Sequence, residues 1–191
     1  MTAKPRATPR LRADAQRNRA RVLEVAQGIF AAEGIGVPIA EIAKRAGVGI
    51  GTVYRQFPTK ESLFAAIVQN KIDRLADEAA SLADDARPDV AFFALLDRMV
   101  ADSAQKRDLV DALAGAGVDV KSVAAASSRR LRVALGNLLR RAQAAGAVRR
   151  DVNVAELLAL MAATLEAARR TGTSSTRLFA VTRDGLQKKI R

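Results

Sequence analysis

The sequence predicts an all-α protein, and three observations support this. Apolar residues recur at intervals of three and four through most of the 191-residue chain, the spacing of one face of a helix. No alternation of β-branched residues is long enough to predict a strand. Glycine, proline or polar residues separate the periodic segments, as they do between helices. We therefore expect a series of amphipathic helices around an apolar core.

The first expected helices lie between about residues 17 and 57. The first begins near Arg17, places Val22, Ala26, Ile29 and Phe30 on one face, and ends at "EGIG". Pro38 opens a short second helix, since its missing N–H is tolerated there. Ile39, Ile42, Ala43 and Ala46 share one face of that helix, which Gly47 ends. A third helix is expected from Ile50 to Phe57, with Gly49 as a modest N-cap.

Thr59 is expected to cap a longer helix, with Glu61 in its first turn, that runs to about Ala83. Its inward face would hold Phe64, Ile67, Val68, Ile72 and Leu75, and "DDARPD" would end it. Further amphipathic segments cover residues 90–104, 107–115, 122–146, 153–170 and 176–190.

The composition lowers the expectation of catalysis. Apolar residues make up 49% of the chain, enough for one large or two small domains, but no apolar run approaches the ~18 residues of a membrane span. The N-terminus lacks the apolar run that a secretory signal requires. Cysteine and histidine are absent, which removes disulfides, thiolate nucleophiles and the usual general base. We predict no enzymatic activity, no cofactor and no metal. An enzyme using Asp97 and Asp102 is a weaker alternative, because that spacing puts them on different helix faces.

The formal net charge is +12, and its cations gather in two blocks. Residues 1–21 hold seven Lys and Arg against Asp14, and residues 1–16 are expected to form a disordered basic arm because they have almost nothing to bury. The second block, residues 127–150, holds seven arginines and no acid, while residues 71–126 are acidic. A solvated helix surface, pairing with the acidic stretch and binding of an anionic ligand all remain open for the Arg129–Arg150 block.

The segment "GVGIGTVYRQF", residues 47–57, could cradle a phosphate or make a tight turn between helices. A dinucleotide-binding fingerprint requires its glycines after a strand, whereas these follow a helix. A helix-turn-helix fits better: Ala43 is small at the crossing, Gly47 turns the chain, and Val48 and Val53 are apolar plugs. A plain helical hairpin remains the alternative.

The stretch "IAEIAKRAGVGIGTVYRQFPTKESLF" resembles the DNA-binding signature of the TetR family of transcriptional regulators. "RVLEVAQGIFAAEG" is similar to the first helix of that family, so the resemblance covers about residues 17–70. The matching elements are Ala43, Gly47, Val48, Gly51-Thr52-Val53-Tyr54, Phe57 and Lys60-Glu61. Gly49, Val37-Pro38 and Gln56 depart from the family pattern, which usually has a hydroxyl at the first two places and often histidine at the third.

The resemblance implies an N-terminal three-helix DNA-binding domain, residues 17–60, followed by a helical-bundle ligand-binding and dimerisation domain, residues 61–191. Tyr54 and Lys60 would contact phosphate, although Tyr54 could instead be a core aromatic beside Phe57. Thr52 and Arg55 would read base edges, and Ile50 would touch a thymine methyl or simply pack. The basic arm would contact phosphate or the minor groove. The expected DNA-binding residues are Arg17, Arg19, Ile50, Gly51, Thr52, Tyr54, Arg55, Gln56 and Lys60.

The implied function is that of a cytoplasmic bacterial regulator, most often a repressor, associated with the nucleoid through its operator. It would bind a near-palindromic operator as a homodimer, and a small, apolar or weakly polar effector would release it. A non-specific architectural DNA binder is the alternative. The expected effector-pocket residues are Ile67, Phe92, Phe93, Leu96, Met99, Val100, Leu113, Leu135 and Leu138, any of which could also be ordinary core.

The last two expected helices are the candidates for the dimer interface. Each carries an apolar stripe at spacings of three and four, and two such pairs could close a four-helix bundle across a two-fold axis. Alternatively, both stripes complete the core of their own chain. The expected interface residues are Leu157, Leu160, Met161, Thr164, Leu165, Leu178, Val181, Thr182 and Leu186.

Overall fold

The computed structural model describes residues 9–82, 87–119, 122 and 124–187, and within these ranges it is helical without a strand. This confirms the predicted all-α class. An isolated antiparallel bridge joins Val148 to Gln187. The named helices are α1 (Pro9–Glu33), α2 (Ile39–Ala46), α3 (Ile50–Gln56), α4 (Lys60–Ser81), α5 (Pro88–Gly115), α7 (Ala125–Ala144), α8 (Val154–Thr171) and α9 (Ser175–Leu186).

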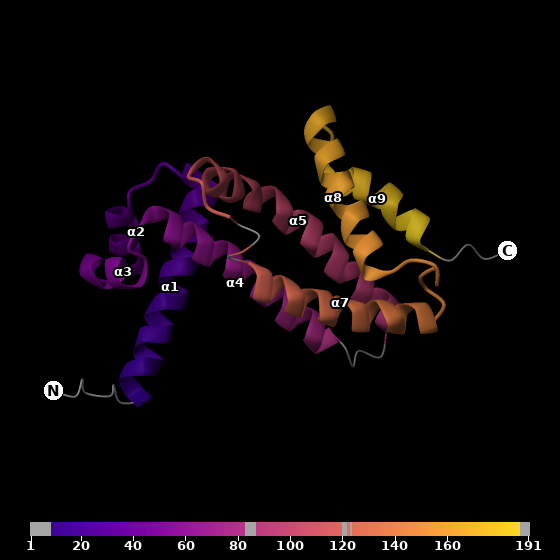
Figure 1. Cartoon of the computed structure of the whole chain (residues 1–191), viewed down its shortest axis with the longest axis horizontal. Coiled ribbons are helices and arrows are strands. Elements are labelled where there is room, and N and C mark those ends of the chain that lie inside the picture. Colours follow the sequence, from indigo (N-terminus) through magenta and orange to yellow (C-terminus); the bar gives the residue numbers. More distant parts are fainter. Residues whose placement is uncertain (1–8, 83–86, 120–121, 123, 188–191) are drawn as a thin grey trace.

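The helices form an N-terminal group and a longer bundle (Figure 1). Helices α1, α2 and α3 gather at one end of the molecule, and α4 leads from them into the bundle. There α4 packs against α5 and α7, while α8 and α9 pack on each other at the opposite end. The expected arrangement, a helix-turn-helix followed by a helical bundle, is therefore confirmed.

Helix α1 begins at Pro9, so the expected helix start near Arg17 is wrong, and residues 9–16 are not the disordered arm we expected. Proline suits the first turn of a helix, and Arg17 forms an ion pair with Asp14 one turn earlier on the same helix. Residues 1–8 of the expected arm lie outside the described residues. Similarly, the segments expected at 90–104 and 107–115 form one helix, α5, because no glycine or proline separates them.

The core is continuous from the N-terminal helices into the bundle. The rings of Phe30 in α1 and Phe64 in α4 meet edge to face with centroids 5.1 Å apart. On the surface, Arg45 of α2 forms ion pairs with Glu33 at the end of α1 and with Glu41. The hydrogen bond from Arg45 lowers the pKa of the Glu33 carboxyl. These contacts hold α2 against α1, and α3 follows α2 directly.

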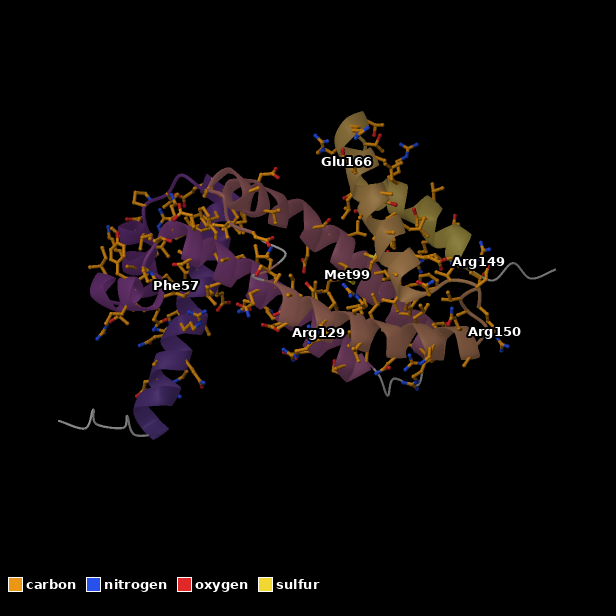
Figure 2. All side chains as sticks on the ribbon, viewed as in Figure 1. Phe57, Met99, Arg129, Arg149, Arg150 and Glu166 are labelled. Atoms are coloured by element: carbon orange, nitrogen blue, oxygen red, sulfur yellow. The ribbon has the colours of Figure 1, made fainter. Side chains whose placement is uncertain are left out.

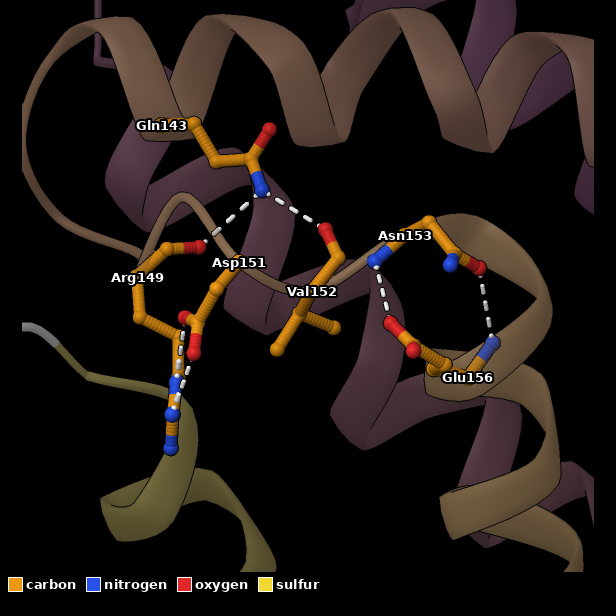
Figure 3. Close-up of polar contacts among 6 residues, drawn as sticks. All are labelled: Gln143, Arg149, Asp151, Val152, Asn153 and Glu156. Carbon is orange, nitrogen blue, oxygen red and sulfur yellow. Dashed lines mark hydrogen bonds and ion pairs between the residues drawn. The ribbon is translucent and has the colours of Figure 1, made fainter.

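The corner between α7 and α8 is built from polar contacts (Figure 3). Gln143 Nε2 donates to the carbonyl oxygens of Arg149, at 3.0 Å, and Val152, at 2.8 Å. Asn153 and Glu156 form a reciprocal capping box at the start of α8, with hydrogen bonds of 2.9 and 3.0 Å. Arg149 binds Asp151 through two nitrogens and lowers the pKa of Asp151 to about 2. These contacts determine where α8 begins.

The second basic block does not form one surface. Arg129 lies near the start of α7, whereas Arg149 and Arg150 lie beyond its other end (Figure 2). Arg130 reaches across to α4, where it pairs with Asp73 at 2.8 Å and Asp77 at 2.5 Å. Pairing with the acidic stretch, one of the three interpretations left open, therefore holds for Arg130, while Arg149 pairs with Asp151.

Candidate nucleic-acid interface

The turn between α2 and α3 has the geometry predicted for a helix-turn-helix. Gly47 is left-handed, with φ 63° and ψ 32°, a conformation that favours glycine. Its N–H donates to the Lys44 carbonyl at 3.1 Å, and the Val48 N–H donates to the Ala43 carbonyl at 3.0 Å. The Gly49 carbonyl then accepts from the N–H groups of Thr52, at 2.8 Å, and Val53, at 3.2 Å, without any side-chain cap. The predicted role of Gly47 is confirmed.

Helix α3 is too short to be stable alone, and packing holds it in place. Ala43, Val48, Val53 and Phe57 are all buried, as expected of the crossing and its plugs. Burying a valine side chain contributes roughly 1.5–3 kcal/mol, so Val53, which is 1% exposed, fixes the inner face of α3.

The outer face of α3 carries large side chains that the fold leaves uncovered. Ile50 is 46% exposed and Tyr54 47% exposed. Tyr54 is therefore not the core aromatic that one interpretation allowed; Phe57, at 1%, takes that role. Gly51 is also exposed, and a Cβ added to it would meet nothing within 4 Å. The face is thus open to a large partner.

Polar groups on α3 are arranged unequally. Arg55 Nη2 donates to Thr52 Oγ1 at 2.9 Å, so the two expected base readers are neighbours, and Arg55 is exposed. Gln56 differs because its Oε1 is buried without a hydrogen-bond partner among the described residues. Gln56 is therefore directed partly into the protein.

Lys60 is the first residue of α4 and is partly exposed. Its cation lies at the positive end of the helix dipole, which is unfavourable, and its Nζ stands 5.9 Å from the centroid of the Phe64 ring. The predicted N-cap at Thr59 is confirmed: Thr59 Oγ1 accepts from the Ser62 N–H at 3.1 Å, and Ser62 Oγ accepts from the Thr59 N–H at 3.2 Å. The capping box with Ser62 was not predicted.

The two expected contacts on α1 lie in different environments. Arg17 is exposed and paired with Asp14. The Arg19 guanidinium carbon lies 4.6 Å from the centroid of the Phe57 ring, a cation–π contact that joins α1 to the end of α3. Arg19 therefore helps to position α3, a role that the sequence pattern did not reveal because the two residues belong to different helices.

Of the nine expected pocket residues, Met99 lines a cavity of about 210 Å³ between α4, α5, α7 and α8. The other eight belong to the packed core. The sequence reading missed Lys71 and Asp102, which line the same cavity. Lys71 is only 6% exposed, and its burial could have been suspected, since it follows Ile67 and precedes Leu75 by one helical turn each.

The expected dimer stripe divides between two faces, which corrects the single stripe proposed from spacing. Leu157, Met161, Thr164 and Leu186 are buried within their own chain, and the hydroxyls of Thr164 and Thr182 lie 2.9 Å apart. By contrast, Leu160 is 43% and Val181 70% exposed. Leu165, Leu178 and Thr182 are partly buried. One side of α8 therefore completes the core. Leu160 has the same spacing of three and four from Leu157 and Thr164 but remains exposed, so the spacing alone does not decide which residues are covered.

The two aspartates of the enzyme alternative make different contacts. Asp97 Oδ2 accepts a hydrogen bond from Arg183 Nη1 at 2.8 Å, and Asp102 lines the cavity beside Lys71. Within the described residues, no group of three or more His, Cys, Asp or Glu is placed to hold a metal. No described helix has the length and apolar character needed to cross a membrane.

Comparison with known proteins places this geometry in a family. A model of the bacterial regulatory proteins of the tetR family matches residues 22–67, and one of the SbtR-like transcriptional regulator C-terminal domain matches residues 87–188. An HTH-type transcriptional regulator of Staphylococcus aureus is 36% identical over 76 residues, 39% of this chain and 41% of its own length. The chain thus matches less than half the length of that curated relative.

Solved structures also match nearly the whole chain. A TetR transcription regulatory protein from Mycobacterium vanbaalenii is 47% identical, with 93% of this chain and 99% of that chain covered and a TM-score of 0.74. A TetR transcriptional regulator from Streptomyces coelicolor is 30% identical, with 90% and 99% covered and a TM-score of 0.72. The chain belongs to the TetR family of transcriptional regulators.

Proposed function

We propose that this protein is a bacterial cytoplasmic repressor that binds a near-palindromic operator as a homodimer and leaves it when a small molecule binds. The exposed outer face of α3 carries this proposal, since Ile50, Gly51, Tyr54 and Arg55 are open on a helix that packing holds rigidly. The net charge of +12 supports attraction to a phosphate backbone. We retain residues 17–60 as the DNA-binding unit and residues 61–191 as the ligand-binding and dimerisation unit.

A homodimer is proposed because one short recognition helix makes too few base contacts to specify a site in a genome. The outward side of α8 and α9 suits a second copy: Leu160 and Val181 are exposed, and the exposed alanines 159, 163 and 167 of α8 allow close helix approach. The inward residues Leu157, Met161 and Thr164 would support this surface from within rather than form it.

Release by a small molecule is proposed because α4 spans both regions. Lys60 stands at its first residue, next to the recognition helix, while Lys71 and Leu75 line the cavity further along the same helix. A ligand that binds better to a conformation with the wrong spacing of the two α3 helices would shift the population away from the operator-bound form.

Selection from random duplexes at physiological salt tests the DNA-binding proposal. The expected result is a near-palindromic consensus sequence. Changing one half of this DNA sequence so that it is no longer symmetric should lower the affinity of the protein for it. Equal affinity for all duplexes would instead favour the architectural alternative. A reporter carrying the selected operator then determines the sign of regulation: expression should rise when the gene for this protein is deleted.

A double change, Leu160→Glu with Val181→Glu, tests the dimer, because it places charges on the proposed seam without disturbing the buried side of α8. We expect a helical monomer by analytical ultracentrifugation that has lost tight operator binding. Leu157→Glu is the contrast, since Leu157 is 0% exposed and its replacement should unfold the domain. A double variant that remains dimeric would place the interface elsewhere.

A further inference from the structure

The cavity beside Lys71 has an apolar body and one polar end. Met99 of α5, Leu131 of α7 and Leu158 and Met161 of α8 provide apolar walls. Lys71 of α4 and Asp102 of α5 provide the charges. Figure 2 places Met99 in the middle of the bundle, on the part of α5 near α7 and α8. The volume of about 210 Å³ is smaller than the roughly 300–1,000 Å³ of pockets for drug-sized ligands, so a compact ligand fits.

The Lys71 side chain is buried as a whole and lines both this cavity and a neighbouring polar one, and no described side chain forms an ion pair with it. It is 6% exposed, and it makes no hydrogen bond or ion pair with any side chain that the structure describes. Burial lowers the pKa of Lys71, while the negative charge of Asp102 acts in the opposite direction. Ser103, also on the wall, already donates its hydroxyl proton to the Val100 carbonyl at 2.6 Å.

The carboxylates on the other side of Lys71 are engaged elsewhere. A second, polar cavity of about 480 Å³ shares Lys71 and Asp102 and includes Asp77 and Glu78. Glu78 pairs with Arg98 at 3.3 Å and Asp77 with Arg130 at 2.5 Å. The Lys71 ammonium group is thus left without a paired carboxylate among the described residues, and an acceptor that a ligand brings into the cavity would gain a charge-assisted hydrogen bond from it.

We propose that the cavity between α4, α5, α7 and α8 binds a compact organic monocarboxylate whose carboxylate pairs with Lys71 and whose apolar part lies against Met99, Leu131 and Met161. Asp102, on the same wall, disfavours a second negative charge. This inference rests on the proposed function, because the carboxylate would be the effector that the repressor senses. It narrows the apolar or weakly polar effector expected from composition to an anion with an apolar body.

Titration of the DNA-free protein by NMR with hexanoate, hexanamide and hexylammonium tests the site directly, since the three probes share an apolar chain and differ in charge. We expect hexanoate to bind about tenfold or more tightly than hexanamide, the range of a hydrogen bond to a charged group. Lys71→Met should remove this preference. Arg74→Gln, which removes a cation that lines the polar cavity but not the apolar one, should keep it.

The absence of saturable hexanoate binding, equal affinity for hexanoate and hexanamide, or a preference that survives in Lys71→Met would each overturn the proposal. Tighter hexylammonium binding would also overturn it and assign Asp102 as the anchor.

Operator affinity of the same variants without any probe tests the repressor proposal independently. Specific hexanoate binding without release from the operator would leave the site standing and contradict the effector role. If Lys71→Met fails to fold, Leu158→Trp, which fills the cavity from a half-buried position, should block hexanoate instead.

Discussion

Replacing Gly51 with alanine is expected to change fold stability and DNA affinity in opposite directions. Gly51 is the second residue of α3, has no left-handed φ, and an added Cβ would meet no atom within 4 Å. The methyl group therefore enters helical backbone without a clash. Alanine is favoured over glycine within a helix by about 0.5–1 kcal/mol, and the position near the helix start argues for the lower value.

The same methyl group stands on the exposed part of α3 that also carries Ile50 and Tyr54, where the proposal requires close backbone approach to the groove. Disturbing one direct base contact costs about 1–3 kcal/mol, so operator affinity should fall roughly five- to 150-fold by the usual conversion. Urea denaturation followed by circular dichroism measures the first effect, and fluorescence anisotropy with labelled operator measures the second.

Gly28→Ala is the matched control. Gly28 is an exposed glycine within α1, and an added Cβ there also meets nothing within 4 Å. It should stabilise the fold by a similar amount and leave operator affinity unchanged. If Gly51→Ala binds the operator as tightly as the unmodified protein, the groove-facing assignment of this surface is refuted. If it lowers stability, the helical account of Gly51 is wrong.

Lys60→Ala should weaken binding to every duplex and reduce the slope of log affinity against log salt concentration by about one unit. Arg55→Ala should instead lose discrimination at one symmetric pair of base positions by roughly 1–3 kcal/mol. Affinities of both variants measured across salt concentrations and operator variants distinguish the two roles, and exchanged behaviour would reverse the assignments. Gly47→Ala should destabilise the protein by about 1–2 kcal/mol from backbone strain alone, because no atom lies within 4 Å of the added Cβ; an unchanged urea midpoint would contradict it. Arg169 and Arg170 lower the pKa of Glu166 from 4.5 to about 2. The stabilisation from the ionised Glu166 is therefore complete above its unfolded pKa and is lost as the pH falls toward its folded pKa. The difference in melting temperature between the unmodified protein and Glu166→Gln should narrow from pH 7 to pH 3. A difference that stays constant would exclude this ion-pair contribution.

Local features of the DNA-binding unit were predictable from the sequence. Gly47 turns the chain through its own backbone, Val48 and Val53 are buried plugs beside that turn, and Thr59 caps α4 through the Ser62 N–H three residues later. The helical turn, its cap and its plug depend on neighbouring residues, so their spacing was sufficient. The start of α1 was the exception, because the charged segment after Pro9 lacks the apolar periodicity on which the expectation relied.

The apolar pattern of α8 determined that the helix buries a face, but the tertiary structure determined which one. Met161 faces the chain's own core and Leu160 faces outward, although the two are adjacent and similarly apolar. The stacking of Arg19 on Phe57 and the pairing of Arg183 with Asp97 likewise join residues far apart in sequence.

Lys71 shows the same limit most clearly. The sequence placed it on the inward side of a helix among apolar residues, yet a long cationic side chain in such a position usually extends to solvent. Only the packing of α5 and α7 against α4, with α8 on the far side of the cavity, leaves it buried there. Helix formation depends on interactions within one or two turns, which the sequence contains explicitly. Burial, cavities and cross-helix pairs depend on where distant segments meet, and that is decided by the whole fold.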